Sequence, residues 1–219
     1  KKIIASLLAS AALTTPVFAD PLKETEYFTM HSMGCMLLRE CTDDVKQVYN
    51  ILDISSQYPN TDSFYSFATE FNNMINSLNM IGVNVFLSDQ KYFPVGHRGV
   101  YHTVGNNFFL NKAFMGRPSV LMSVMRHEGW HAAQDCMAGT IDNSLIAIIK
   151  PEDQVPMLWS EIVESTYPES VWPWEKEATW AGKTEGMTSD ALAACAEGNM
   201  WEVYEPTPLT RKYLVKEGY

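Results

Sequence analysis

The pentapeptide His127-Glu128-Gly129-Trp130-His131 carries the clearest chemistry in the sequence. Residues four positions apart lie on the same face of an α-helix, so both imidazoles can reach one ion. Zn²⁺ binds histidine nitrogen at about 2.0–2.1 Å and lowers the pKa of a bound water to about 7. Glu128 follows the first histidine, where its carboxylate can take a proton from that water. The pattern predicts one catalytic zinc ion per chain, with His127 and His131 as ligands and Glu128 as general base.

A catalytic zinc ion usually has a third protein ligand and keeps a fourth position for water. The longer motif HExxHxxGxxH would supply another histidine, but Gln134 and Met137 occupy its last two fixed positions. Four downstream glutamates are better candidates: Glu161, Glu164, Glu175 and Glu177. The last two lie on the segment with the cleaner helical pattern. We expect Glu175 to be the ligand, with Glu177 as the alternative and His102 as a minor candidate.

The sequence HEGWH, followed by WEKEA at residues 174–178, resembles the zinc metallopeptidases of the gluzincin type. In those enzymes a glutamate on a later helix is the third zinc ligand. The resemblance covers residues 120–181 and implies peptide-bond hydrolysis, with Glu175 as that ligand. Several such families carry Asp or Asn four residues after this glutamate, whereas this chain has Thr179. The residue that orients the ligand is therefore left open, and Glu177 remains the alternative.

The same resemblance implies a zincin-like fold, in which the edge strand of a small sheet guides an extended substrate. Residues Asn107–Asn111 are the expected edge strand. His102 or Tyr101, from a neighbouring strand-like segment, is the expected stabiliser of the oxyanion.

Helical and strand periodicities predict the elements that would position these residues. Residues 117–139 form the strongest predicted helix, with Pro118 in its first turn and Gly139 as its C-terminal cap. Other predicted helices cover residues 45–52 (after a cap at 42–44), 63–78, 156–165, 174–181 and 191–198 (after a cap at 188–190). Predicted strands cover residues 82–89, 99–104 and 107–111, and the last two are joined by a bend at Gly105-Asn106. This order indicates an α+β fold, mostly helical, with a small mixed or antiparallel sheet before the HExxH helix.

The N-terminal segment has the composition of a secretory signal peptide. Two lysines precede a short apolar run over residues 3–13, and small residues lead to Ala19, after which we expect cleavage. The run is too short to cross a bilayer, which needs about 20 residues. Residues 1–19 are therefore expected to be removed, and the protein is expected in the periplasm or outside the cell.

Residues 20–219 are expected to form one zincin-like metallopeptidase domain, with a C-terminal arm over about 205–219. The chain has 219 residues, of which 46% are hydrophobic, enough for a sizeable core. Its formal net charge is −10, without a basic run, so nucleic acid is not an expected partner. No segment after the N-terminal one reaches about 18 consecutive apolar residues, so no membrane span is expected.

Export also bears on the four cysteines, because an even number in an oxidising compartment indicates disulfides. We expect Cys35–Cys41 and Cys136–Cys195, one of three possible connectivities. Six residues of continuous helix would separate the first pair by about 9 Å, beyond the roughly 7 Å limit between bridged Cα atoms. That pairing therefore predicts a non-helical stretch between Cys35 and Cys41.

These observations favour a secreted or periplasmic zinc metallopeptidase whose partner is a peptide or protein substrate. The sequence specifies no oligomeric state. Three alternatives remain open: an exported zinc-binding protein on the same scaffold without peptidase activity, a partner-binding domain without metal, and a zinc enzyme that cleaves another amide, such as one in cell-wall peptide.

Overall fold

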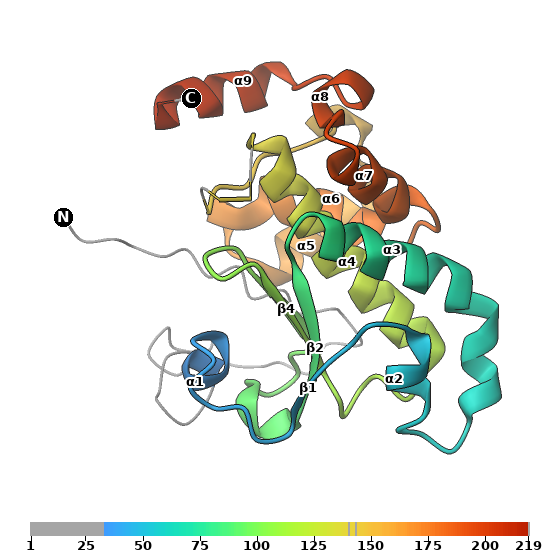
Figure 1. Cartoon of the computed structure of the whole chain (residues 1–219). Coiled ribbons are helices and arrows are strands. Elements are labelled where there is room, and N and C mark those ends of the chain that lie inside the picture. The colour runs from blue at the N-terminus through green and yellow to red at the C-terminus, as the bar shows by residue number, and fades with distance from the viewer. Residues whose placement is uncertain (1–32, 140, 143, 219) are drawn as a thin grey trace.

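The computed structural model describes residues 33–139, 141–142 and 144–218 of the chain. The predicted signal peptide, residues 1–19, lies outside the described residues. The described part is an α+β fold, mostly helical, with a four-stranded mixed sheet beside its longest helix (Figure 1). Within these ranges no helix is both long and apolar enough to cross a membrane.

The helices of the described part fall before, between and after the strands. The α-helices are α1 (Met33–Leu37), α2 (Ile51–Ser55), α3 (Ala68–Met80), α4 (Pro118–Met137), α5 (Met157–Thr166), α6 (Trp172–Ala181), α7 (Met187–Ala196), α8 (Met200–Val203) and α9 (Pro208–Glu217). Short 3-10 helices are η2 (Thr61–Phe67), η3 (Gln90–Tyr92), η4 (Glu152–Gln154) and η5 (Glu169–Val171).

The sheet has the strand order β1-β2-β4-β3. Its strands are β1 (Val45–Gln47), β2 (Asn84–Ser88), β3 (Gly99–His102) and β4 (Asn107–Asn111). β2 pairs with β1 in antiparallel and with β4 in parallel orientation, and β3 and β4 form an antiparallel hairpin. The predicted bend at Gly105-Asn106 lies within the loop of this hairpin, where Asn106 has a φ of 49°, a left-handed conformation that asparagine tolerates.

The expectation that Asn107–Asn111 is an edge strand is wrong, because β4 lies inside the sheet. All five of its residues are buried. Phe108 and Leu110 belong to the main core with the helices, whereas Phe109 belongs to a smaller cluster on the other face, next to α1. Covered on both faces and paired on both sides, β4 cannot receive a further strand. The edge next to α4 is β3 instead.

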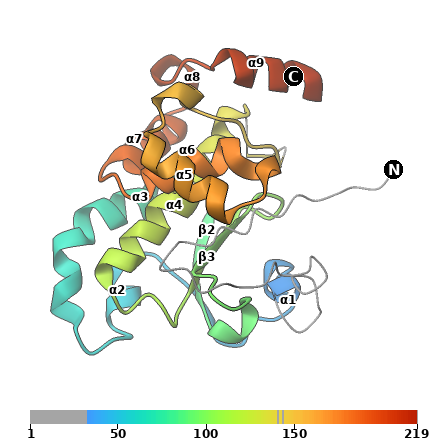
Figure 2. The ribbon, with the colours of Figure 1, turned by 180° about the vertical axis from the view of Figure 1, so that it is seen from behind.

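Helix α4 carries the HExxH residues and runs through the interior. Pro118 stands in its first turn, and the chain leaves the helix at Gly139, which has a φ of 108°. Most of its residues are buried, because α3, α6, α7 and β3 pack around it. The view from behind shows α6 beside α4, with α5 packed on α6 (Figure 2).

Two of the predicted helix starts are wrong. Residues 45–47 pair with β2 as strand β1, and the helix begins only after Asn50. There the Asn50 side chain accepts a hydrogen bond from the backbone, and Asp53 accepts one in return, which fixes the start of α2. Helix α7 begins after Gly186, which has a φ of 80°, and not at a cap over residues 188–190. The Thr188 hydroxyl donates instead to the carbonyl of Arg126 on α4.

The segment expected as a C-terminal arm contains an ordered helix. Residues 208–217 form α9, whose first turn is capped by the Thr207 side chain. Thr210 and Leu214 are buried against the fold, and the Thr210 hydroxyl donates to the carbonyl of Ile148 at 2.6 Å. Helix α9 therefore packs on the loop that precedes α5.

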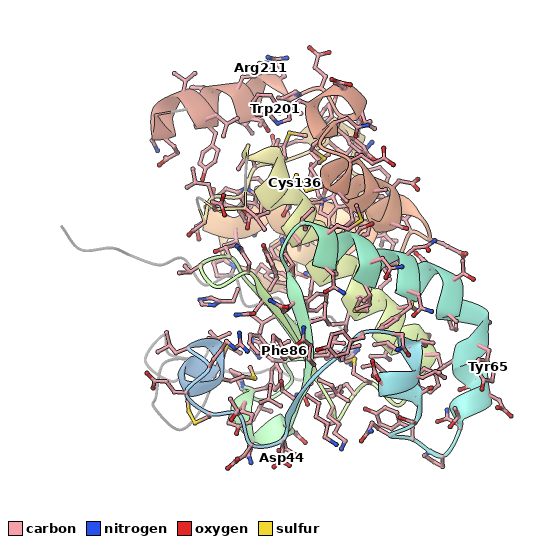
Figure 3. All side chains as sticks on the ribbon, in the orientation of Figure 1. Asp44, Tyr65, Phe86, Cys136, Trp201 and Arg211 are labelled. Carbon is pink, nitrogen blue, oxygen red and sulfur yellow. A yellow bond between two sulfur atoms is a disulfide. The ribbon has the colours of Figure 1, made fainter. Side chains whose placement is uncertain are left out.

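Both predicted disulfides are confirmed. The Cα atoms of Cys35 and Cys41 are 5.2 Å apart, and those of Cys136 and Cys195 are 6.1 Å apart. Helix α1 ends at Leu37, so the first bridge spans a helix end and a turn, as the spacing requires. The second bridge joins the last turn of α4 to α7 (Figure 3).

Candidate metal centre

Three side chains from α4 and α6 converge in the interior of the fold. The Nε2 atom of His127 lies 3.3 Å from Oε2 of Glu175, and the Nε2 atom of His131 lies 3.4 Å from its Oε1. One ligand atom from each residue lies within 4.8 Å of the others, and all three residues are buried. Ligands about 2.0–2.1 Å from a tetrahedral zinc ion are about 3.4 Å apart, so the donor set and its spacing fit that ion.

Small residues let the helices that carry these ligands approach each other. Ala178 and Ala181 on α6 are fully buried. A Cβ on Gly182, at the end of α6, would lie 3.2 Å from Cβ of His127. On another side of α4, a Cβ on Gly129 would lie 3.0 Å from Thr188 of α7. The glycine within HEGWH therefore serves helix packing and leaves the metal chemistry to its neighbours.

The charges of the three converging side chains depend on one another. Burial raises the pKa of Glu175, but the neighbouring His131 and His127 outweigh it and lower this pKa to about 2. Burial lowers the pKa of His131, but the Glu175 carboxylate outweighs it and raises this pKa to about 9. For His127 burial prevails and its pKa is lowered. Without metal, the site at neutral pH therefore holds an imidazolium on His131 beside an ionised Glu175.

Glu177 is not brought to the histidines, although the sequence left it as the alternative ligand. Its carboxylate accepts hydrogen bonds from the Trp130 indole at 3.1 Å and from the Gln134 amide at 2.9 Å. It also accepts bonds from the backbone N–H groups of Ile149 and Lys150. Burial raises the pKa of Glu177 to about 7. This side chain joins α6 to α4 and to the loop before α5, close behind the ligand cluster.

Gln134 is a site residue that the sequence reasoning missed. Its Oε1 atom lies 2.8 Å from Nδ1 of His131, while its amide nitrogen donates to Glu177. The signal was its position three residues after His131, which places both side chains on one helix face. In the longer zinc motif this position carries glycine, which has no side chain to hold a ligand histidine.

Glu128 is completely buried, and its Oε2 atom accepts a hydrogen bond from the backbone N–H of Tyr101 at 3.0 Å. Strand β3 can approach α4 so closely because residue 99 is glycine. A Cβ there would lie 2.6 Å from Val124 and 3.1 Å from Cγ of Glu128. The candidate general base is thus held between the HExxH helix and the sheet edge.

The outer edge of β3 follows from its pairing with β4. The carbonyl of Arg98 accepts a bond from the N–H of Asn111, so residues 98, 100 and 102 point their backbone groups toward β4. The peptide groups of Gly99 and Tyr101 therefore point away from the sheet. The bond from Tyr101 to Glu128 agrees with this alternation.

Tyr101 and His102, the two residues expected to stabilise an oxyanion, lie in different surroundings. The Tyr101 hydroxyl donates to buried Asp135 at 2.8 Å, so it is engaged in the core and the expectation is wrong for it. Burial raises the pKa of Asp135 to about 7, and burial together with Asp135 raises the pKa of Tyr101. His102 lies at the hairpin end of β3, beside Gly105, and is not grouped with the ligands.

The described residues thus contain a buried His-His-Glu group that could hold a metal ion, with a further glutamate beside it. Comparison of the chain with protein-family models, with curated proteins and with solved structures finds no match. A function must therefore be inferred from the chemistry of these residues.

Proposed function

We propose that the protein is an exported zinc-dependent metallopeptidase of the gluzincin type. The observation that supports it most is the convergence of His127, His131 and Glu175, with Glu128 held next to them by the edge strand. Two imidazoles and one carboxylate at tetrahedral spacing are a donor set typical of catalytic zinc, which keeps a fourth position open. The two disulfides fit an oxidising compartment.

Zinc bound by this set would act as a Lewis acid toward the scissile carbonyl and make a water acidic enough to attack it near neutral pH. Glu128 takes the proton from that water and passes it to the leaving amine. The Tyr101 N–H fixes the Glu128 carboxylate in position before substrate arrives. Glu128 thus works as a base whose orientation is set by the backbone of β3.

The outer edge of β3 supports an extended peptide as the substrate. The peptide groups of Gly99 point away from β4, and a substrate strand can pair with such an edge through main-chain hydrogen bonds. The same edge lies against α4 at Glu128, so a peptide paired there would pass the base. This is the role that the sequence assigned to Asn107–Asn111 and that we now assign to β3.

The decisive experiment pairs metal content with turnover in wild type and in Glu128→Gln. The substitution keeps the side-chain shape, so about one zinc per chain should remain, while peptide cleavage falls by about 10²–10⁴-fold. Glu161→Gln, the same change at an exposed position of α5, is the control and should behave as wild type. Equal cleavage by Glu128→Gln and wild type would sink the assignment. Bound zinc without cleavage of any peptide in a broad library would favour the non-enzymatic zinc protein.

A further inference from the structure

Two cationic side chains flank the segment of α4 that leads into the metal centre. Arg98 directly precedes Gly99, the residue of β3 that touches Val124 and Glu128. It is only 6% exposed, and its guanidinium lies over the ring of Phe114, 5.3 Å from the centroid. Its charge therefore lies beside the segment that leads from β4 to α4, close enough to Lys183 to influence the pKa of that ammonium group.

The second cation lies on the α6 side. Lys183 follows Gly182, where a Cβ would be 3.2 Å from Cβ of the ligand His127. Its ammonium group donates to the hydroxyl of Ser123 on α4 at 2.9 Å, and the side chain is exposed. Lys183 thus contacts α4 at Ser123, one turn before His127, and Gly99, the neighbour of Arg98, contacts the same stretch at Val124 and Glu128.

No carboxylate neutralises these two charges within the described residues. Neither Arg98 nor Lys183 makes an ion pair there, whereas the nearby Arg126 is bound by both oxygens of Glu70. Arg117 precedes the first turn of α4, which contains no acid. In a chain with a net charge of −10, Arg98, Arg117 and Lys183 are thus cations without an ion-pair partner among the described residues.

The pKa shifts of Lys183 and Arg98 agree with the presence of other positive charges nearby. Burial lowers the pKa of Lys183, and the charges of Arg98 and Arg126 lower it further. Burial also lowers the pKa of Arg98, with a contribution from Arg117. Cations that repel each other in a partly buried setting are stabilised when an anion binds between them.

We propose that Arg98 and Lys183 form a subsite for a carboxylate of the peptide substrate, next to the scissile bond. This inference rests on the proposed function and names the substrate class: peptides with a carboxylate close to the point of cleavage. Arginine binds a carboxylate through two parallel N–H groups, and lysine adds a compact charge. The carboxylate comes from the peptide C-terminus or from an acidic side chain, and the test separates the two.

The test measures peptide binding to the zinc-loaded Glu128→Gln protein, in which turnover is suppressed. One pair of short peptides differs only in a free or amidated C-terminus, and a second pair, both amidated, differs only in an internal Glu or Gln. We expect the carboxylate-bearing member of one pair to bind about tenfold more tightly, as for a charge-assisted hydrogen bond. Arg98→Gln and Lys183→Gln should each lose most of this preference. The control Lys46→Gln, at an exposed position of β1, should keep it.

Either outcome of the peptide test is informative without catalysis. A preference that disappears in both variants supports the subsite, and the pair that shows it identifies the carboxylate. No preference in either pair, or a preference that survives both substitutions, overturns it. Zinc content and thermal unfolding of each variant exclude misfolding, and the exposed Lys183 decides the matter if Arg98→Gln fails to fold. Failure of the peptidase assignment would appear separately, as absence of cleavage by wild type.

Discussion

The Nδ1 atom of His131 lies 2.8 Å from Oε1 of Gln134. The Gln134 amide nitrogen donates to Glu177 and to the carbonyl of Trp174, so its oxygen must be the atom that faces the imidazole. The histidine Nδ1 therefore carries a hydrogen, and Nε2 points at Glu175. Gln134 thus fixes both the rotation and the tautomer that a metal ligand at this position needs.

Glu175 and Glu177 should respond differently to the same conservative change. Glu175→Gln removes the charge from the ligand cluster, and we expect zinc to be lost. Glu177→Gln replaces an acceptor of several hydrogen bonds behind the cluster, so zinc should remain with an affinity about 10–100-fold lower. Metal analysis and chelator competition measure both effects, with Glu161→Gln as control. If Glu175→Gln kept zinc and Glu177→Gln lost it, Glu177 would be the ligand and this assignment would be wrong.

Zinc affinity should rise with pH across the neutral range. In the metal-free protein the pKa of His131 is raised to about 9, so its proton must leave before Nε2 can bind metal. Glu175, with a pKa lowered to about 2, is ionised throughout this range and adds no pH dependence. Each pH unit between 7 and 9 should therefore strengthen binding by about tenfold. Competition titrations at several pH values test this, and an affinity that does not change between them would contradict it.

Tyr101→Phe should lower stability and spare catalysis. Among the described residues, the change removes the one hydrogen bond made to the carboxylate of Asp135, at a cost of about 1–3 kcal/mol. Burial raises the pKa of Asp135 to about 7 although the Tyr101 hydroxyl lowers it, so Asp135 is protonated in the fold at pH 5.5 and ionised at pH 8, where the bond from Tyr101 becomes charge-assisted. The loss should therefore be larger at pH 8 than at pH 5.5, as measured by urea unfolding. A large drop in turnover with unchanged stability would instead make the hydroxyl part of the catalytic apparatus.

The two disulfides should contribute unequally to stability. In the chain-entropy model a bridge across 59 residues stabilises by about 4 kcal/mol and one across six residues by about 2 kcal/mol. Replacing Cys136 and Cys195 together by serine should thus shift the urea midpoint more than replacing Cys35 and Cys41. Non-reducing peptide mapping checks that the remaining bridge is intact in each variant. The reverse order of the two shifts would contradict this account.

The sequence predicted the parts of the fold that depend on local pattern. Helix α4 and strand β4 lie where their periodicity placed them, and Glu175 lies beside the two histidines as the resemblance implied. The spacing of HEGWH alone places His127 and His131 on one helix face. A helical spacing of four is itself a statement about geometry, so this part of the site needed no tertiary information.

The parts that failed depend on neighbours distant in the sequence. Residues 45–47 form a strand because β2 pairs with them, and β4 is an interior strand because β2 and β3 pair with its two edges. Likewise, the role of Glu177 is set by the backbone of Ile149 and by Trp130. No local pattern separates it from Glu175, two positions away.

The hydrogen bond from the Tyr101 N–H to Glu128 has a consequence for how this position should be studied. Its donor belongs to the main chain, so every residue except proline supplies it. An alanine substitution at position 101 would report only the loss of the phenol ring. The backbone hydrogen bond to Glu128 would remain. Only Tyr101→Pro, or replacement of this amide by an ester through chemical synthesis, would reveal what the contact contributes. Part of the proposed active site is therefore set by the path of the backbone, which side-chain mutagenesis does not change.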